Sequence, residues 1–173
     1  MYQRLADTLR RFLPVPWLFR HGFNWSPMYR RTTARITAVS DDLHRVNVRL
    51  PISWRNRNYV GTIFGGSLYA MSDPIYMIQL VQILGPEFVV WDKAATIRFR
   101  RPARSDVTAE FVFTADEIRD IRARTQEQGS FDVVKQVALL DVAGATVAEV
   151  TKTIYVATKA HYRSRTSAPS TAP

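Results

Sequence analysis

The chain has 173 residues, 46% of them hydrophobic and 12% aromatic, which is enough for one core of ordinary size but not for two domains. It contains no cysteine, and its three histidines, His21, His44 and His161, are far apart in the sequence. This composition excludes disulfides and a thiolate nucleophile, and it predicts that the protein holds no metal.

The formal net charge of +9 is concentrated in residues 1–60, which hold eleven Lys or Arg against three Asp or Glu. This asymmetry favours attraction to a polyanion such as nucleic acid, an anionic membrane surface or the phosphates of a nucleotide-bearing cofactor. A solvated basic face is the simpler interpretation of the charge. No helix-turn-helix, zinc or RNA-recognition signature accompanies it, so we expect no nucleic-acid partner.

Residues 1–28 are expected to form a helical extension. Apolar side chains at spacings of three and four predict a short amphipathic helix over residues 2–13, ended by Pro14 and Pro16. The opening segment has no uninterrupted apolar run followed by a small-residue cleavage site, so we expect a cytoplasmic protein.

The next segment, Arg35–Leu50, is predicted to be a β-hairpin. Apolar residues alternate at Val46, Val48 and Leu50, and a turn is expected at Ser40-Asp41-Asp42.

Residues 65–84 predict one helix about 28 Å long, ended by Gly85-Pro86. Its apolar side chains lie around the whole circumference, which is typical of a helix buried on all sides. The segment lacks Lys and Arg, but it contains Asp73, Pro74 and two glutamines, so we expect no membrane span.

Strand-like runs rich in β-branched residues follow at residues 89–101, 107–114, 133–140 and 146–158. The charged residues 116–128 predict a surface helix or a long turn, and residues 160–173 are expected to be a disordered tail.

Two strands, a buried helix and then antiparallel strands predict an α+β domain over residues 29–159, with one curved sheet covering the helix. The exposed edges of such a sheet predict pairing with a second copy.

Asp73 is the leading candidate for chemistry, because an acid within an apolar helix must be desolvated, which demands a compensating role. Its neighbours at three and four residues include Tyr69, Tyr76 and Met77. A purely structural role is equally open, in which Asp73 accepts hydrogen bonds from buried tyrosines and Pro74 introduces a kink.

Glycines lead into this helix at Gly61, Gly65 and Gly66. Free N–H groups at a helix start stabilise an oxyanion or a phosphate, although glycines at such a place more often make a tight turn.

The run from Asn58 to Asp73 resembles the helix-entry motif of hotdog-fold thioesterases, in which Asn, Gly, His-Gly-Gly and a later Asp recur at this spacing. Gly61, Gly65 and Gly66 match the glycines of that motif. The sequence RFRRPARSDVTAEF resembles the strand-turn-strand that follows the helix in that fold.

More broadly, residues 16–157 are similar to a hotdog-like family of unassigned function whose members are often labelled acyl-CoA thioesterases. The resemblance implies a hotdog fold and an acyl site between two subunits of a homodimer or a dimer of dimers. It implies that Asp73 acts as general base or nucleophile, that Gly66 N–H polarises the thioester carbonyl and that Asn58 orients water or substrate. It implies no cofactor beyond the coenzyme A of the substrate.

Phe64 stands where the thioesterase motif has His, so the polar role of that residue is absent. The change fits a site for a longer apolar acyl chain, whose candidate lining residues are Phe64, Gly65, Tyr69, Tyr76 and Met77. Plain core packing is the alternative for each aromatic side chain.

Arg98 and Arg100 are candidates for the anionic end of coenzyme A. They alternate with Ile97 and Phe99 and so face away from the core, as an ordinary solvent-facing strand also requires. Further candidates are Arg55, Arg57, Arg101 and Arg104.

Two rival functions share the fold. One is a non-catalytic protein that binds acyl-CoA or a fatty-acyl ligand, which Phe64 favours. The other is dehydration of a hydroxyacyl thioester, which ranks lower because that reaction relies on a His and none lies near Asp73 in the sequence.

Overall fold

The structure is a computed structural model that describes residues 13–167. Its elements are α2 (Val15–Trp25), α3 (Pro27–Arg31), β1 (Arg35–Val39), β2 (Arg45–Leu50), α4 (Gly65–Ser72), α5 (Ile75–Leu84), β3 (Phe88–Phe99), β4 (Val107–Val112), α6 (Ala115–Gln128), β5 (Ser130–Leu140), β6 (Thr146–Thr158) and α7 (Lys159–Ser167). The helix predicted for residues 2–13 falls almost wholly outside the described residues.

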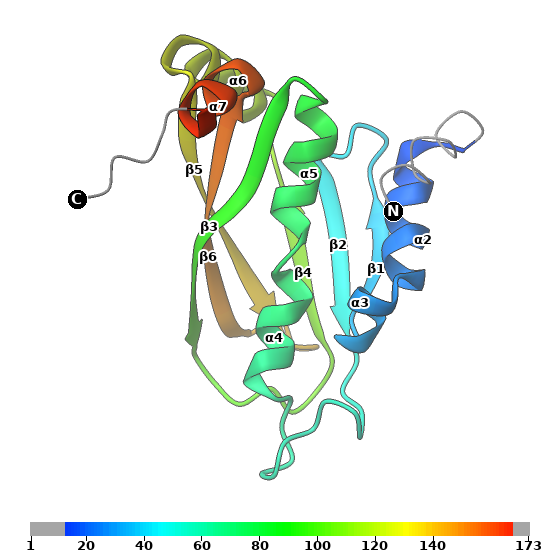
Figure 1. The fold of residues 1–173 in the computed structure, drawn as a ribbon. Coiled ribbons are helices and arrows are strands. Elements are labelled where there is room, and N and C mark those ends of the chain that lie inside the picture. Colours follow the sequence, from blue (N-terminus) through cyan, green and yellow to red (C-terminus); the bar gives the residue numbers. More distant parts are fainter. Residues whose placement is uncertain (1–12, 168–173) are drawn as a thin grey trace.

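The six strands form one antiparallel sheet in the order β1-β2-β4-β5-β6-β3, and this sheet curves around the helix pair α4 and α5 (Figure 1). Alternation along the strands explains which face is buried. In β2, Val46, Val48 and Leu50 point into the core while Arg45 and Arg49 are exposed. The predicted α+β hotdog architecture and the hairpin of β1 and β2 are confirmed.

The central helix is broken, contrary to the prediction of one continuous element. α4 ends at Ser72 and α5 begins at Ile75. Pro74 explains the break, because proline has no N–H with which to continue the hydrogen-bond ladder.

The helix pair is also not buried on all sides, as was expected. Met71, Ile75 and Leu80 are fully buried against the sheet. The opposite side carries a half-exposed stripe at intervals of four residues, because the sheet covers only one side of the helices; it consists of Tyr69, Asp73, Met77 and Val81.

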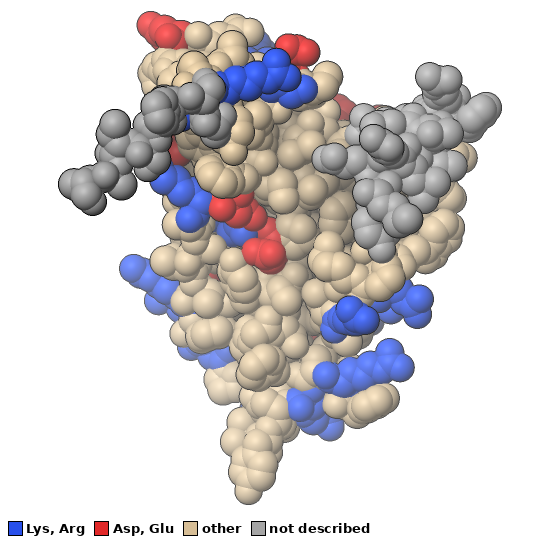
Figure 2. Space-filling model, in the orientation of Figure 1, with Lys and Arg blue, Asp and Glu red and all other residues tan. Residues whose placement is uncertain are grey.

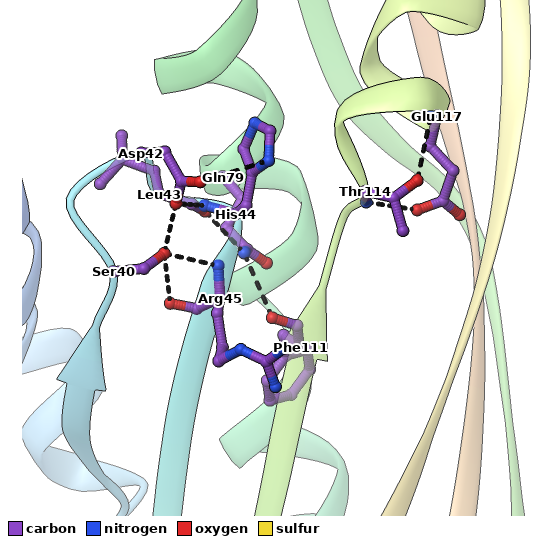
Figure 3. Close-up of polar contacts among 9 residues, drawn as sticks. All are labelled: Ser40, Asp42, Leu43, His44, Arg45, Gln79, Phe111, Thr114 and Glu117. Carbon is purple, nitrogen blue, oxygen red and sulfur yellow. Dashed lines mark hydrogen bonds and ion pairs between the residues drawn. The ribbon is translucent and has the colours of Figure 1, made fainter.

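Gln79 ties α5 to the sheet from a fully buried position. Its Nε2 donates to the carbonyl of Leu43 at 2.9 Å and, more weakly, to that of Phe111 at 3.4 Å (Figure 3). One side chain thereby connects the helix to the turn after β1 and to β4.

The charged segment predicted as a surface helix or a long turn is the helix α6. Thr114 and Glu117 form a capping box at its start, in which Glu117 N donates to Thr114 Oγ1 and Thr114 N donates to Glu117 Oε2 (Figure 3). This reciprocal pair satisfies two backbone donors that the first turn leaves without helical partners.

The disordered tail predicted from residue 160 is wrong as far as Ser167, because Lys159–Ser167 form α7. Tyr162 packs edge-on against Trp91, and the His161 ring lies where a side chain on Gly129 would otherwise sit. These contacts anchor a segment whose composition gave no sign of order. Residues 168–173 lie outside the described part.

The two edges of the sheet differ. The helix α2 lies along the β1 edge, where Asn24 Nδ2 donates to Ile36 O at 2.8 Å and Asn24 Oδ1 accepts from Ile36 N at 2.9 Å. At the other edge, no strand within residues 13–167 pairs with the outer side of β3, and nearly all of its residues 93–99 are exposed. One edge is therefore closed and the other open.

Candidate functional site

Asp73 lies at the break between α4 and α5, where its backbone N–H donates to Tyr69 O at 3.1 Å. Its side chain is 49% exposed, whereas the sequence led us to expect full desolvation. The reason is its place on the half-exposed stripe, which the sheet of the same chain does not cover. Solvent therefore reaches the carboxylate.

A buried lysine holds this carboxylate. The side chain of Lys152 in β6 is only 1% exposed, and its ammonium group lies 3.0 Å from Asp73 Oδ1, 3.0 Å from the Asp73 carbonyl oxygen and 2.8 Å from Asp92 Oδ2. Tyr69 OH donates to the same Asp73 Oδ1 at 2.8 Å. We call Tyr69, Asp73, Asp92 and Lys152 the carboxylate–lysine cluster.

The cluster brings four ionisable groups together where burial and charge oppose each other. Burial lowers the pKa of Lys152, but its hydrogen bonds to Asp92 and Asp73 outweigh burial, so the pKa lies above the usual value and the lysine stays charged. Burial raises the pKa of Asp92, and the hydrogen bond from Lys152 offsets only part of that rise. Burial and the hydrogen bond to Asp73 raise the pKa of Tyr69, which keeps its phenol protonated as a donor.

One oxygen of each carboxylate in the cluster is not bonded to Lys152. Asp73 Oδ1 receives both Tyr69 and Lys152, so the second carboxylate oxygen is the one left to face a ligand. Asp92 Oδ1 is buried and has no hydrogen-bond partner within the described residues. A carboxylate fixed through one oxygen and half exposed is suited to act as a general base or a nucleophile.

The start of α4 is flanked by two exposed aromatic rings. A Cβ placed on Gly66 would lie 2.3 Å from Phe64 Cε1, and one on Gly65 would lie 2.9 Å from Phe99 Cζ. Phe64 and Phe99 are 58% and 57% exposed. Glycine at both positions lets the two rings approach the backbone, and a side chain there would have to displace an exposed ring.

Gly66 and Asp73 occupy opposite ends of α4. Seven residues of helix separate them by about 10 Å along the axis at 1.5 Å per residue. The N–H of Gly66 and the carboxylate of Asp73 in one chain are therefore too far apart to contact the same carbonyl group.

Asn58 organises the loop before α4. Its Oδ1 accepts from the N–H groups of Val60 and Thr62, and its Nδ2 donates to Thr62 Oγ1 at 2.9 Å. Its polar atoms are therefore engaged within its own loop, and the structure does not bring it to Asp73.

The other candidates for the acyl pocket are divided between core and surface. Tyr76 is buried between the rings of Phe111 and Phe113, and its hydroxyl donates to Gln136 O at 3.1 Å, so it belongs to the core. Burial raises its pKa to about 12. Met77 lies half-exposed on the stripe beside Asp73.

The two arginines assigned to phosphate binding have different surroundings. Arg100 is paired with Glu149 at 2.6 Å, which leaves it less available to an anion. Arg98 is exposed on the edge strand β3, and its position in the ladder faces Glu149.

Sequence reasoning missed Lys152 and Asp92. Val150, Lys152 and Ile154 occupy alternate, inward positions of β6, so a lysine in phase with core residues was the available signal for a buried cation. Asp92 gave no such signal, because β3 is irregular between Asp92 and Ala94 and its alternation is lost there.

Within residues 13–167, no three His, Asp or Glu side chains are grouped so that they could hold a metal ion. None of the helices in this range is long and apolar enough to cross a membrane.

Comparisons with known proteins agree with this fold. Residues 16–156 match the family model described as a domain of unknown function, DUF4442. No curated protein sequence matches the chain.

Among solved structures, a Pseudomonas aeruginosa protein described as a probable thioesterase is 25% identical, with a TM-score of 0.75 over 84% of this chain and 98% of that one. A Chlorobaculum tepidum protein of unknown function is 13% identical, with a TM-score of 0.68 over 84% and 98%. A Haemophilus influenzae thioesterase is 16% identical, with a TM-score of 0.58 over 81% and 88%.

Proposed function

This chain belongs to the DUF4442 family, and from that premise we propose that it is a thioesterase that hydrolyses acyl-CoA, with Asp73 as its reactive carboxylate. The observation that carries the proposal is the carboxylate–lysine cluster, in which Lys152 and Tyr69 fix a half-exposed Asp73 through one oxygen. The likeness to the probable thioesterase from Pseudomonas aeruginosa supports the reaction class.

Two routes use the same carboxylate. As a general base, Asp73 takes a proton from water, the hydroxide adds to the thioester carbonyl carbon, and the C–S bond breaks to release the thiolate, which is then protonated. As a nucleophile, Asp73 adds to that carbon and expels the thiolate, and water then hydrolyses the acyl-aspartyl anhydride. Both routes end in a carboxylic acid and free coenzyme A.

The oxyanion in either route needs a donor close to the reacting carbon. Since Gly66 and Asp73 of one chain lie about 10 Å apart, the proposed site takes Asp73 from one copy and the Gly66 N–H from a second. The open edge of β3 and the half-exposed stripe are the surfaces on which a second copy would pack, giving a homodimer.

A non-catalytic acyl-ligand binder is the second candidate. Phe64 favours it, because its ring lies against Gly66, where a thioester carbonyl would have to bind, and supplies no polar group there. Such a protein would keep the apolar acyl site and the homodimer but would not hydrolyse its ligand.

The first experiment measures free-thiol release from acyl-CoA thioesters of increasing chain length, with wild-type protein and Asp73→Asn. Loss of a general base or nucleophile should lower kcat at least about 100-fold for the preferred chain length. Asp116→Asn, an exposed carboxylate on α6, is the matched control and should leave the rate unchanged. A flat panel for wild-type protein would favour the acyl-ligand binder.

The second experiment tests the two-copy site by mixing variants. Gly66→Pro removes the N–H, and Gly66→Ala adds the same Cβ against Phe64 but keeps the N–H, so it is the matched control. Asp73→Asn and Gly66→Pro chains, each inactive alone, should regain about a quarter of wild-type activity when unfolded and refolded together, since half the dimers then hold one intact site. No recovery would place both groups within one chain.

A further inference from the structure

A basic hollow lies between α3 and the loop that leads into α4. It has a volume of about 420 Å³ and is lined by Pro27, Arg30, Arg31, Thr33 and Arg55. Figure 2 shows Lys and Arg side chains gathered over this part of the molecule, on the same face as the α4–α5 pair. We call it the arginine hollow.

Among the described residues, the arginines of the hollow have no acidic partner. Within residues 13–167, no carboxylate lies within ion-pair distance of Arg30, Arg31 or Arg55. Elsewhere in the described chain, exposed arginines such as Arg45 and Arg100 are paired with glutamates. Three like charges facing one hollow repel each other unless an anion lies between them.

The hollow is held in shape by a buried side chain. Asn56 is 3% exposed; its Nδ2 donates to Thr33 Oγ1 at 2.8 Å and to Pro51 O at 2.8 Å, and its Oδ1 accepts from Ser53 N at 2.8 Å. These bonds join the chain before β1 to the loop that carries Arg55.

Thr33 adds backbone strain to this wall of the hollow. Its φ is +66°, a left-handed conformation that a β-branched residue rarely adopts. Strain of this kind persists only where the surrounding structure enforces it. The backbone conformation of this wall is therefore fixed by the folded chain around it.

The two segments that line the hollow are hydrogen-bonded to α4. Tyr29, in α3 beside Arg30, donates its hydroxyl to Met71 O at 3.0 Å, two residues before Asp73. Phe64 N, at the start of α4, donates to the carbonyl of Asn56, which follows Arg55.

From this geometry we propose that the arginine hollow binds the phosphates of the nucleotide end of coenzyme A. The assignment rests on the proposed function, because it is the acyl-CoA of that reaction whose phosphates would be held. It moves the anion site from Arg98 and Arg100, the leading candidates in the sequence, to Arg30, Arg31 and Arg55. Guanidinium groups bind phosphate through paired N–H donors, which suits them to the 3′-phosphate and the pyrophosphate.

The test measures direct binding of adenosine 3′,5′-bisphosphate by calorimetry at low salt. Arg31→Ala and Arg55→Ala should each weaken binding about tenfold, consistent with one lost hydrogen-bonded charge. Arg119→Ala is the charge-matched control, because Arg119 is exposed on α6 and paired with Asp116, and it should not change the affinity. Arg98→Ala is the rival arm, and weakening there with none at Arg31 would overturn the proposal.

Further probes separate the kinds of anion. Inorganic pyrophosphate should bind more weakly than the nucleotide, and a short DNA duplex should not displace the nucleotide. Equal binding of pyrophosphate, or tight binding of the duplex, would overturn the assignment to coenzyme A.

Turnover separates this proposal from the proposed function. If acyl-CoA is hydrolysed, Arg31→Ala should raise KM about tenfold with kcat little changed, as expected for binding energy remote from the reacting bond. Turnover with an unchanged KM would overturn the hollow while the thioesterase stands. Arginine-dependent binding of the nucleotide without any turnover would support the hollow and count against hydrolysis.

Discussion

Replacing Lys152 by Met should destabilise the protein more than any single loss of a surface charge. The change keeps an unbranched apolar side chain one atom shorter than lysine but removes an ammonium group bonded to Asp73 Oδ1, the Asp73 carbonyl oxygen and Asp92 Oδ2. Asp92, whose side chain is 23% exposed, would then hold a largely buried charge with no cation bonded to it, while half-exposed Asp73 can turn to water.

The size of the effect follows from these contacts. Removing one partner of a buried ion pair typically costs about 3–5 kcal/mol. Because Asp73 is half exposed, we expect the lower end, about 3 kcal/mol, and a Tm lowered by roughly 6–12 °C for a chain of this length.

The measurement is urea unfolding at a fixed protein concentration, for wild type, Lys152→Met, Asp92→Asn and the double variant. Asp92→Asn should recover about 1–2 kcal/mol in the Lys152→Met background, because it removes the unpaired charge. The loss in Lys152→Met should also shrink as the pH falls and Asp92 takes up a proton. A Lys152→Met protein within about 1 kcal/mol of wild type would refute this account of the cluster.

Three further outcomes are expected. Burial raises the pKa of Asp92, so the protonated carboxyl is favoured in the folded protein. The stability that this protonation contributes is fully present below the unfolded pKa of about 3.8 and is lost as the pH rises through the higher folded pKa. The difference in unfolding free energy between wild type and Asp92→Asn should therefore grow with pH. Thr114→Ala should cost about 1 kcal/mol through loss of the capping box, seen as a lower urea midpoint with the same slope, whereas Thr108→Ala, at an exposed position of β4, should cost less. Asn56→Ala should cost about 1–3 kcal/mol by leaving buried partners unsatisfied, and a thermal melt equal to wild type would contradict this.

The sheet could be predicted because its strands obey simple alternation. Val46, Val48 and Leu50 are in phase, and β6 carries the same pattern over a longer run. These patterns depend only on which face meets the core, so the sequence alone contains them.

The helix pair could be predicted only in part. The apolar run from Gly65 to Leu84 indicated a central helix, but its all-round apolar character suggested burial that a single chain does not provide at Tyr69, Asp73 and Met77. A sequence shows which side chains are apolar, but it does not show whether the same chain or another one covers them. Pro74 was the visible sign of the break.

The site was the least predictable part. Asp73 was identified from its unusual setting, yet its partner Lys152 lies seventy-nine residues away in β6. That contact depends on which strand passes beneath the helix break, a matter of topology that no local spacing contains. Asn58 and Tyr76 matched the expected residue types, but their polar atoms are satisfied within a loop and within the core.

The side chain of Asn24 sets a limit on assembly. By bonding both the N–H and the carbonyl of Ile36, it occupies the place on β1 that a further strand would take. A sheet with two free edges can add copies end to end without limit and so grow into a fibre, whereas a sheet with one free edge is used up when that edge meets its counterpart. In the homodimer proposed above, joining through β3 would therefore stop at two chains, because the Asn24 amide already occupies the β1 edge on the far side of the molecule.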